Sequence, residues 1–531
     1  MNRFSKTMSL SRPKTAVATA VLLMSLSAAA VAQRDPGVRG GLANTGGGLQ
    51  SRGIPIPHPP LISDNPNHPD LKPSTNEKLL FVEGIKRSGQ LESICDTCSA
   101  PPFGVGDGNP VGPPFAPPGT EIDPDFPQTM TNSNGLGTVH NSDNCFECHA
   151  QPILGGSGGF IATKKGEVAE NPAFRIVPRR FQRQNVTPSF ETRFGPIREV
   201  RFIRNPDGTP DGGVHALYTQ KGDISNTNPH AAECTVTQPD FEAELAKGNV
   251  AFRIPLQMFG LGLIESIEDA EILRHAAHGQ LGVQGHPNRS GNDGTISRFG
   301  WKAQNKSLAI FAGEAYNVEM GVTNDVFPNA RDENPTCSFG KPEPNDINRV
   351  DETDADNHAF NNPLHELPDW QLFAIMMRFM DAPKPDPYPS ASAVRGRAVF
   401  NSTGCALCHV PQMKTGGTSG DANTSSGGAF NSPVLVDRPA NLFSDLLVHH
   451  MGTGLADGIT QGSAGPDEFR TTPLWGVGQR IFFLHDGRTN DLVQAIRAHA
   501  SNGSEANQVI ARFNGLSGAD KQAVIDFLRS L

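Results

Sequence analysis

The sequence of 531 residues lacks several features that would assign it to common functional classes. It contains no run of about five or six like charges, and its net charge at pH 7 is −10. Because a nucleic-acid surface needs clustered lysine and arginine against phosphate, we expect no nucleic-acid partner. Beyond the first 32 residues, no apolar stretch approaches the roughly 20 residues that cross a bilayer. The mature protein should therefore have no membrane span.

The first 32 residues have the pattern of a signal peptide. Four basic residues form a positive leader, and an apolar run follows from Ala16 to Ala29. This run is too short to span a bilayer, and Ala30-Val31-Ala32 matches a small-residue cleavage site. The mature protein would then begin at Gln33 and be periplasmic or secreted. An uncleaved anchor is the alternative.

Glycine (56 residues) and proline (44 residues) are abundant, so much of the chain should be loop. Residues 33–130 show neither a helical nor a strand period, which predicts an extended arm with few regular elements. Apolar residues at helical spacing predict helices over 265–278 and 307–315, from Pro368 to the proline-rich linker 382–387, and from Leu516 to the end of the chain. The linker places a domain boundary at about residue 386.

Two stretches match the pattern Cys-x-x-Cys-His, at Cys145-Phe-Glu-Cys148-His149 and at Cys405-Ala-Leu-Cys408-His409. In this pattern the two thiols add across the vinyl groups of one porphyrin, and the following imidazole becomes the proximal ligand of the iron. Two matches in one exported chain are far beyond chance. The sequence therefore predicts two covalently attached c-type haems. The alternatives are that the four cysteines form a pair of disulfides, or that each motif supplies half of the ligands of a zinc site.

The four remaining cysteines do not complete a third such motif. Cys95 and Cys98 have the spacing, but Ser99 follows in place of histidine, so a disulfide is favoured over a haem. Cys234 and Cys337 stand alone and can pair with each other or with the 95/98 cysteines. The sequence leaves this pairing open.

The surroundings of the two motifs resemble the bacterial di-haem cytochrome c peroxidase superfamily. The closer resemblance is to its branch of di-haem oxidoreductases, described as peroxidases or thiol oxidoreductases, and it covers about 140–531. It rests on three stretches that begin Phe443-Ser-Asp-Leu-Leu-Val-His-His-Met, Phe469-Arg-Thr-Thr-Pro-Leu-Trp and Leu484-His-Asp-Gly-Arg-Thr. The rubber oxygenases are a more distant di-haem relative.

The fold expected from these features is mainly α-helical. It would comprise two cytochrome c-like haem domains with long irregular connections, and a few short strands in the 150–250 insertion. We expect a catalytic N-terminal haem domain at 131–385 and an electron-transferring C-terminal cytochrome c domain at 386–531.

The resemblance also implies roles near the N-terminal haem. Trp301 falls on the position of a tryptophan that relays electrons between the two haems, and Glu319 falls on that of an acid–base glutamate above the open haem face. The alternatives are a core tryptophan and a solvated glutamate. Phe311 stands where the peroxidases have a glutamine, and Tyr316 and the segment Phe259–Ile264 would face the same pocket. Such an apolar pocket favours oxygen or an apolar substrate over peroxide.

The second haem needs a sixth ligand if it transfers electrons. In the peroxidases a His-Asp-Gly turn precedes a methionine ligand, whereas here the turn at His485 leads, at the same spacing, to His499. Bis-histidine ligation by His409 and His499 would leave the potential lower than methionine would. Met451 is the competing ligand. His449 and His485 are expected to have supporting or structural roles.

Together these features predict a periplasmic di-haem oxidoreductase of peroxidase type. The haem at His149 would do the chemistry, and the haem at His409 would pass it electrons through Trp301 from an external small cytochrome or cupredoxin. Peroxide or another small oxidant would be the substrate. An oxygenase acting on an apolar substrate and a pure electron carrier are the alternatives. Calcium between the haem domains is common in the peroxidases, but its binding positions do not clearly match around 480–482, so calcium is left open.

Overall fold

The computed structural model describes residues 33–36, 61–88, 137, 139–142, 145–158, 171, 185–219, 236–329, 346, 367–416 and 432–531, with the backbone of two strands at 49–51 and 54–56. Residues Gln33–Leu531 form one compact unit. The predicted signal peptide lies outside the described residues, as do Cys95, Cys98, Cys234 and Cys337.

Helices in the described part of the chain are separated by irregular connections. The α-helices are α1 (Thr75–Ser88), α3 (Phe241–Ala246), α4 (Leu261–Glu265), α5 (Asp269–Arg274), α6 (Leu308–Met320), α7 (Asp369–Phe379), α8 (Ala391–Thr403), α9 (Leu492–Ala498), α10 (Asn507–Gly515) and α11 (Gly518–Ser530). Short 3-10 turns are η1 (Cys145–Glu147), η3 (Gln280–Gly282), η7 (Cys405–Leu407), η8 (Pro433–Leu435) and η9 (Val477–Gln479). No described helix combines the length and the hydrophobicity needed to cross a bilayer.

Strands form small antiparallel sheets. The largest described sheet has the order β5 (Val214–His215), β4 (Glu199–Phe202), β7 (Val250–Arg253). The two-stranded pairs are β1 (Leu49–Ser51) with β2 (Ile54–Ile56), β3 (Val139–His140) with β6 (Tyr218–Thr219), β8 (Met413–Lys414) with β9 (Pro439–Ala440), and β10 (Val448–His450) with β11 (Glu468–Arg470). The fold is therefore mixed, with helices, a few short strands and long irregular connections. Its helical content is lower than expected for the mainly α-helical fold that the sequence predicted.

Three of the four predicted helices start where a cap or a proline was found in the sequence. The hydroxyl of Ser307 accepts a hydrogen bond from the backbone at the start of α6, and Ser517 does the same for α11. Pro368 precedes α7, which ends before the proline-rich linker as expected. α6 continues to Met320, beyond the predicted end, where Gly321 closes it at φ 70°.

The sequence predicted one continuous helix over 265–278, and this prediction was wrong. α4 ends at Glu265, α5 covers only Asp269–Arg274, and Glu268 between them is extended. Here Ile267 forms a β-bridge with Thr415, which competes with helical hydrogen bonding. A distant backbone partner thus overrides the local helical period.

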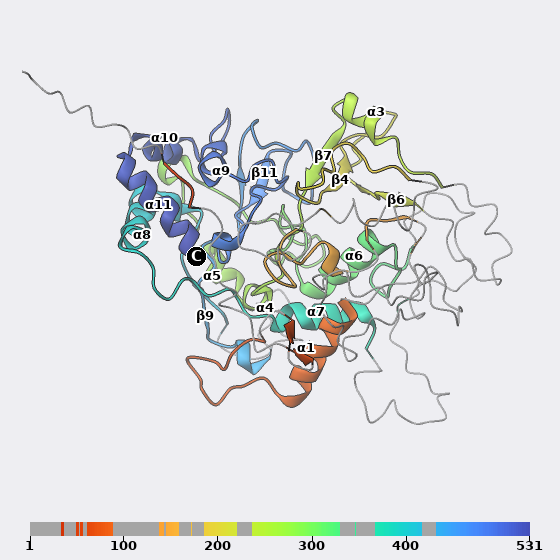
Figure 1. Ribbon diagram of the computed structural model, residues 1–531, viewed down its shortest axis with the longest axis horizontal. Coiled ribbons are helices and arrows are strands. Elements are labelled where there is room, and N and C mark those ends of the chain that lie inside the picture. Colours follow the sequence, from red (N-terminus) through yellow and green to blue (C-terminus); the bar gives the residue numbers. More distant parts are fainter. Residues whose placement is uncertain are drawn as a thin grey trace, which may run out of the picture. The chain divides into compact units, whose positions relative to one another are not determined.

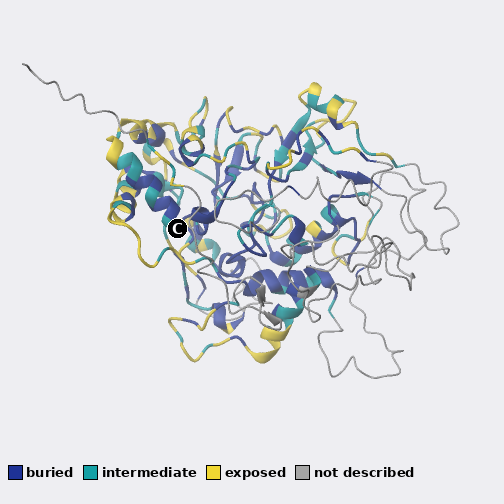
Figure 2. Ribbon diagram, viewed as in Figure 1, coloured by how far each residue is buried: buried dark blue, intermediate teal, exposed yellow. Residues whose placement is uncertain are grey.

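Two helix pairs accompany the two Cys-x-x-Cys-His motifs. α1 packs against α7, and α8 packs against α11, as Figure 1 shows at the bottom and at the left. Phe81 and Ile85 of α1 are buried in the same core as Phe146 of the first motif. α1 lies in the region predicted as an extended arm, so part of that region belongs to the core. Figure 2 shows α7 buried along most of its length.

Glycine allows the second pair of helices to approach closely. A Cβ atom at Gly396 of α8 would lie 1.8 Å from the carbonyl oxygen of Ala523 in α11. No side chain fits at that distance without moving one helix, and this crossing supports the turn that begins at Cys405.

We predict that Gly396→Ala lowers the free energy of unfolding by about 1–3 kcal/mol, because an overpacked core must shift. The matched control is Gly515→Ala at the end of α10, where an added Cβ meets nothing within 4 Å. The control should be neutral or slightly stabilising, since alanine has less freedom in the unfolded chain. Urea unfolding of both variants gives the comparison, and equal midpoints would contradict the close crossing.

Candidate functional site

The two Cys-x-x-Cys-His segments fold alike. Each begins with a 3-10 turn, η1 or η7, and in each the histidine N–H donates to the carbonyl of the first cysteine. These backbone hydrogen bonds are 3.1 Å long for His149 and 3.0 Å for His409. Gly404 precedes the second turn at φ 108°, a conformation that favours glycine. Each turn thus gathers two thiols and one imidazole.

Each turn lies on the wall of a cavity of about 1400 Å³, its open mouth included. We name them the Cys145 cavity and the Cys405 cavity. Cys145, Cys148 and His149 line the first, and Cys405, Cys408 and His409 line the second. Each cavity therefore has two thiols and one imidazole on its wall.

The two imidazoles are held in a form that binds metals. His149 Nδ1 donates to the carbonyl of Gly156 at 3.2 Å, and His409 Nδ1 donates to that of Phe443 at 3.0 Å. A carbonyl only accepts, so Nδ1 carries the proton and Nε2 keeps its lone pair. Burial lowers the pKa of both histidines to about 4. Both rings are therefore neutral at pH 7.

The four thiols are free cysteines rather than disulfides. Burial raises the pKa of Cys405 to about 12, and it also raises the pKa values of Cys148 and Cys408. Each turn supplies two thiols and one imidazole, which is the donor set for covalent attachment and proximal ligation of an iron porphyrin.

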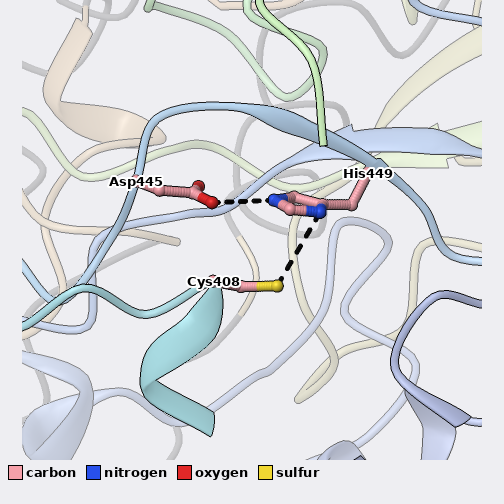
Figure 3. A group of neighbouring side chains, drawn as sticks. All are labelled: Cys408, Asp445 and His449. Carbon is pink, nitrogen blue, oxygen red and sulfur yellow. Dashed lines mark hydrogen bonds and ion pairs between the residues drawn. The ribbon is translucent and has the colours of Figure 1, made fainter. Parts of the chain in front are cut away.

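One further cluster of side chains has the composition of a metal site among the described residues. It comprises Cys408, Asp445 and His449 (Figure 3). His449 Nε2 lies 2.9 Å from Asp445, and its Nδ1 lies 2.8 Å from Glu505. Burial alone would lower the pKa of His449, but the charge of Asp445 raises it well above the ordinary value. A ring that donates from both nitrogens is an imidazolium and does not bind a cation.

Helix α6 forms one wall of the Cys145 cavity. Phe311, Tyr316 and Glu319 all line it, as the sequence predicted. Tyr316 is buried and packs edge-on against Phe373, with ring centroids 5.0 Å apart. Of the segment Phe259–Ile264, only Leu261 lines the cavity. The prediction for the rest of this segment was wrong, because its apolar side chains are buried in the adjacent core.

The same cavity has a charged wall that the sequence did not reveal. Asn141 Nδ2 donates to Glu319 Oε2 at 2.8 Å. Glu199 of β4 lines the cavity with its ion-pair partner Arg201. Burial alone would raise the pKa of Glu199, but Arg201 and a hydrogen bond with Glu319 lower it. Two carboxyl groups share a hydrogen bond only when one of them carries a proton.

Trp301 lines both cavities. Its side chain is 8 % exposed, and Nε1 donates to the carbonyl of Ile254 at 2.9 Å. His485 lies edge-on to the indole, with ring centroids 6.3 Å apart. The ring of His485 also stacks on Phe469 at 4.2 Å. Phe469 and His485 line the Cys405 cavity alone, so Trp301 is the member of this aromatic group that both cavities share.

The sequence of the C-terminal region identifies the family. A family described as "Di-haem oxidoreductase, putative peroxidase" matches residues 201–531, which is more than half of the chain. The chain belongs to this di-haem oxidoreductase family. It is accordingly a haem-dependent oxidoreductase. The motif at Cys145 lies before the matched region, whereas Trp301, Glu319 and the motif at Cys405 lie within it.

Solved structures share only distant similarity with this oxidoreductase. The hydrazine synthase of Kuenenia stuttgartiensis is 19 % identical over 32 % of this chain and 56 % of its own, with a TM-score of 0.20. The di-haem peroxidase BthA of Burkholderia thailandensis is 13 % identical over 50 % of this chain and 77 % of its own, with a TM-score of 0.24. A MauG-like protein associated with microbial copper homeostasis is 13 % identical over 52 % and 89 %, with a TM-score of 0.26. No curated protein matches the sequence.

Both candidate sixth ligands of the oxidoreductase line the Cys405 cavity. His499, at the end of α9, donates from Nδ1 to the carbonyl of Ala495 at 2.8 Å, so its Nε2 keeps a lone pair as in His409. Burial lowers its pKa, and repulsion from His499 contributes to the low pKa of His409. Met451 lines the same cavity, in a cluster with Trp301.

Several side chains on the cavity walls carried no recognisable signal in the sequence. Glu199 and Arg201 lie in the 150–250 insertion, outside any motif. Arg470 lies in the stretch Phe469-Arg-Thr-Thr-Pro that supported the resemblance, but nothing marked it as a cavity residue. Arg480 also lines the Cys405 cavity. Their positions depend on long-range packing.

Proposed function

We propose that this oxidoreductase is an exported di-haem c-type cytochrome with peroxidase-type activity. One observation carries the proposal. Two turns of the same construction each present two thiols and one neutral imidazole to a large cavity, and Trp301 lies on the wall of both. The segment of residues 1–32 supports export to the periplasm. An external small cytochrome or cupredoxin would supply the electrons.

The chain contributes attachment, ligation and orientation to this chemistry. Cys145 and Cys148 would form thioethers with one haem, and Cys405 and Cys408 with the other. His149 and His409 would be the proximal ligands, with the tautomer set by the backbone carbonyls they contact. His499 would be the sixth ligand in the Cys405 cavity. The haem iron, when bound, supplies the redox chemistry.

Two other residues would serve turnover directly. Glu319 would exchange a proton with the oxygen atoms of bound peroxide, and its hydrogen bond to the ionised Glu199 would keep a proton on the pair. Trp301 would carry electrons between the two cavities. Tyr316 would shape the pocket that receives the oxidant. In this proposal residues 131–385 would perform catalysis, and residues 386–531 would transfer electrons.

The charge on the wall of the Cys145 cavity favours peroxide over an apolar substrate. Glu199 and Glu319 line it and can exchange protons, and Arg201 adds a fixed positive charge. The oxygenase alternative draws support from the apolar side of the same cavity, which includes Phe311, Met376 and Met377. Spectroscopy of the pure protein distinguishes the peroxidase, the oxygenase and the pure electron carrier.

The pure protein should carry two haems that survive denaturation, detected by mass spectrometry. Its electron-spin-resonance spectrum should contain one high-spin haem, either as isolated or after half-reduction, and peroxide should oxidise the protein at that haem. A high-spin haem that ignores peroxide and binds oxygen would favour the oxygenase. Two low-spin, inert haems would favour the electron carrier and remove the role of Glu319.

We predict that Glu319→Gln lowers peroxidase turnover by about 10²–10⁴-fold, because a positioned acid–base group contributes a factor of this size. Haem content and the spectrum should stay unchanged. The matched control is Glu314→Gln, which alters another carboxylate of α6 on the same cavity wall. Steady-state kinetics at saturating donor measures the effect. Wild-type turnover in Glu319→Gln would exclude the acid–base role.

Trp301→Phe should slow electron transfer between the haems at least several-fold while both haems stay bound, because phenylalanine is harder to oxidise than tryptophan. The control is Trp475→Phe, a buried tryptophan that lines neither cavity. Stopped-flow reduction, followed at the wavelength of each haem, gives the rate. An unchanged rate in Trp301→Phe would leave this residue a structural role only.

A further inference from the structure

Two buried arginines lie on the wall of the Cys405 cavity. Arg470 is the last residue of β11, and Arg480 follows η9. They are 6 % and 9 % exposed. Each has a buried guanidinium nitrogen without a hydrogen-bond partner in the described structure, Nη1 of Arg470 and Nε of Arg480. Such nitrogens are rare in proteins, because an unpaired buried donor is costly.

These arginines also differ from three other buried arginines in their lack of a carboxylate partner. Arg253 pairs with Asp457, Arg378 with Glu265, and Arg529 with Asp35. For Arg470 and Arg480, burial is the one cause that lowers the pKa, to about 10 in each, and no described carboxylate opposes it. Both side chains are therefore charged at pH 7 and face the cavity without a counter-ion from the described residues. An uncompensated buried charge of this kind calls for an anion.

Both arginines are attached to the segment that holds Trp301. Arg470 donates from its backbone N–H to the carbonyl of Trp301 at 2.8 Å, and from Nε to that of Gly300 at 2.9 Å. The Arg480 guanidinium carbon lies 5.8 Å from the centre of the Trp301 ring, and Arg480 Nη2 donates to Ser157 Oγ at 3.1 Å. These contacts fix both cations between the Cys405 cavity and the tryptophan that lines both cavities.

We propose that Arg470 and Arg480 form an anion subsite that binds the two propionate carboxylates of the haem in the Cys405 cavity. The inference rests on the proposed function, since it needs a haem in that cavity. Guanidinium groups match carboxylates in shape and charge, and two cations on one wall match two propionates on one edge of a porphyrin. Carboxylates held by these arginines would lie close to Trp301, whose ring centre is 5.8 Å from the Arg480 guanidinium carbon.

The subsite has an electrochemical consequence. Positive charge beside a haem favours the reduced state, which carries one more electron, so the arginines raise the midpoint potential of this haem. They also favour the ionised form of the propionates and keep the propionate pKa low. Bis-histidine ligation lowers the potential relative to methionine, and the arginines partly offset that effect.

The test uses the intact holoprotein with Arg470→Gln, Arg480→Gln and the matched control Arg512→Gln, an exposed arginine of α10. Spectroelectrochemical titration over a range of pH measures the midpoint potential of each haem. Both cavity variants should lower the potential of the low-spin haem and move its pH-dependent region to higher pH. The second haem and the control should keep wild-type values, and both thioether-bound haems should remain.

Arg470→Lys and Arg480→Lys keep the positive charge. They provide a second test if the glutamine variants fold poorly. Lysine cannot form the bidentate contact, so these variants should shift the propionate bending bands in resonance Raman spectra while changing the potential less. Variants that lose thermal stability but keep the wild-type potential and Raman bands would overturn the subsite and leave the arginines a structural role. A wild-type protein without haem on Cys405 and Cys408 would instead refute the proposed function itself.

Discussion

The hydrogen bond from the Nδ1 of each motif histidine to a backbone carbonyl is the contact on which the candidate site depends. In His149 and His409 this bond fixes the tautomer, the ring orientation and the nitrogen left for a metal. The carbonyls belong to Gly156 and Phe443, so the bonds form only when the chain after each motif folds back over it. Ligand geometry and tertiary folding are therefore coupled in both halves of the chain.

Helix packing keeps these two turns in place in a protein with much irregular backbone. Each motif is supported by a pair of helices from distant parts of the chain, α1 with α7 and α8 with α11. Glycine allows close approach in both pairs, at Gly84 and Gly396. The described segments between these helices are largely irregular backbone, in keeping with the high content of glycine and proline.

Buried charge then distinguishes the two cavities. The Cys145 cavity carries glutamates that can exchange protons, together with Arg201, which pairs with Glu199. The Cys405 cavity carries the neutral imidazoles of His409, His485 and His499, and two arginines without a described carboxylate partner. In the proposed function, the first arrangement would support proton transfer during catalysis, and the second would support electron transfer. Trp301 lies between them, anchored by Arg470.

The sequence by itself determined the two haem motifs, because covalent attachment requires thiols and an imidazole at fixed local spacing. It also located α6, α7 and α11, since capping residues and helical period are local signals, and the family resemblance indicated Trp301 and Glu319. It did not reveal α1 as a core helix, the break between α4 and α5, or the cavity roles of Glu199, Arg470 and Arg480. Those features depend on partners far away in the chain, such as Ile267 with Thr415. Only the tertiary structure decides which polar groups lose water and which charges face each other, and both effects govern what a buried residue can do.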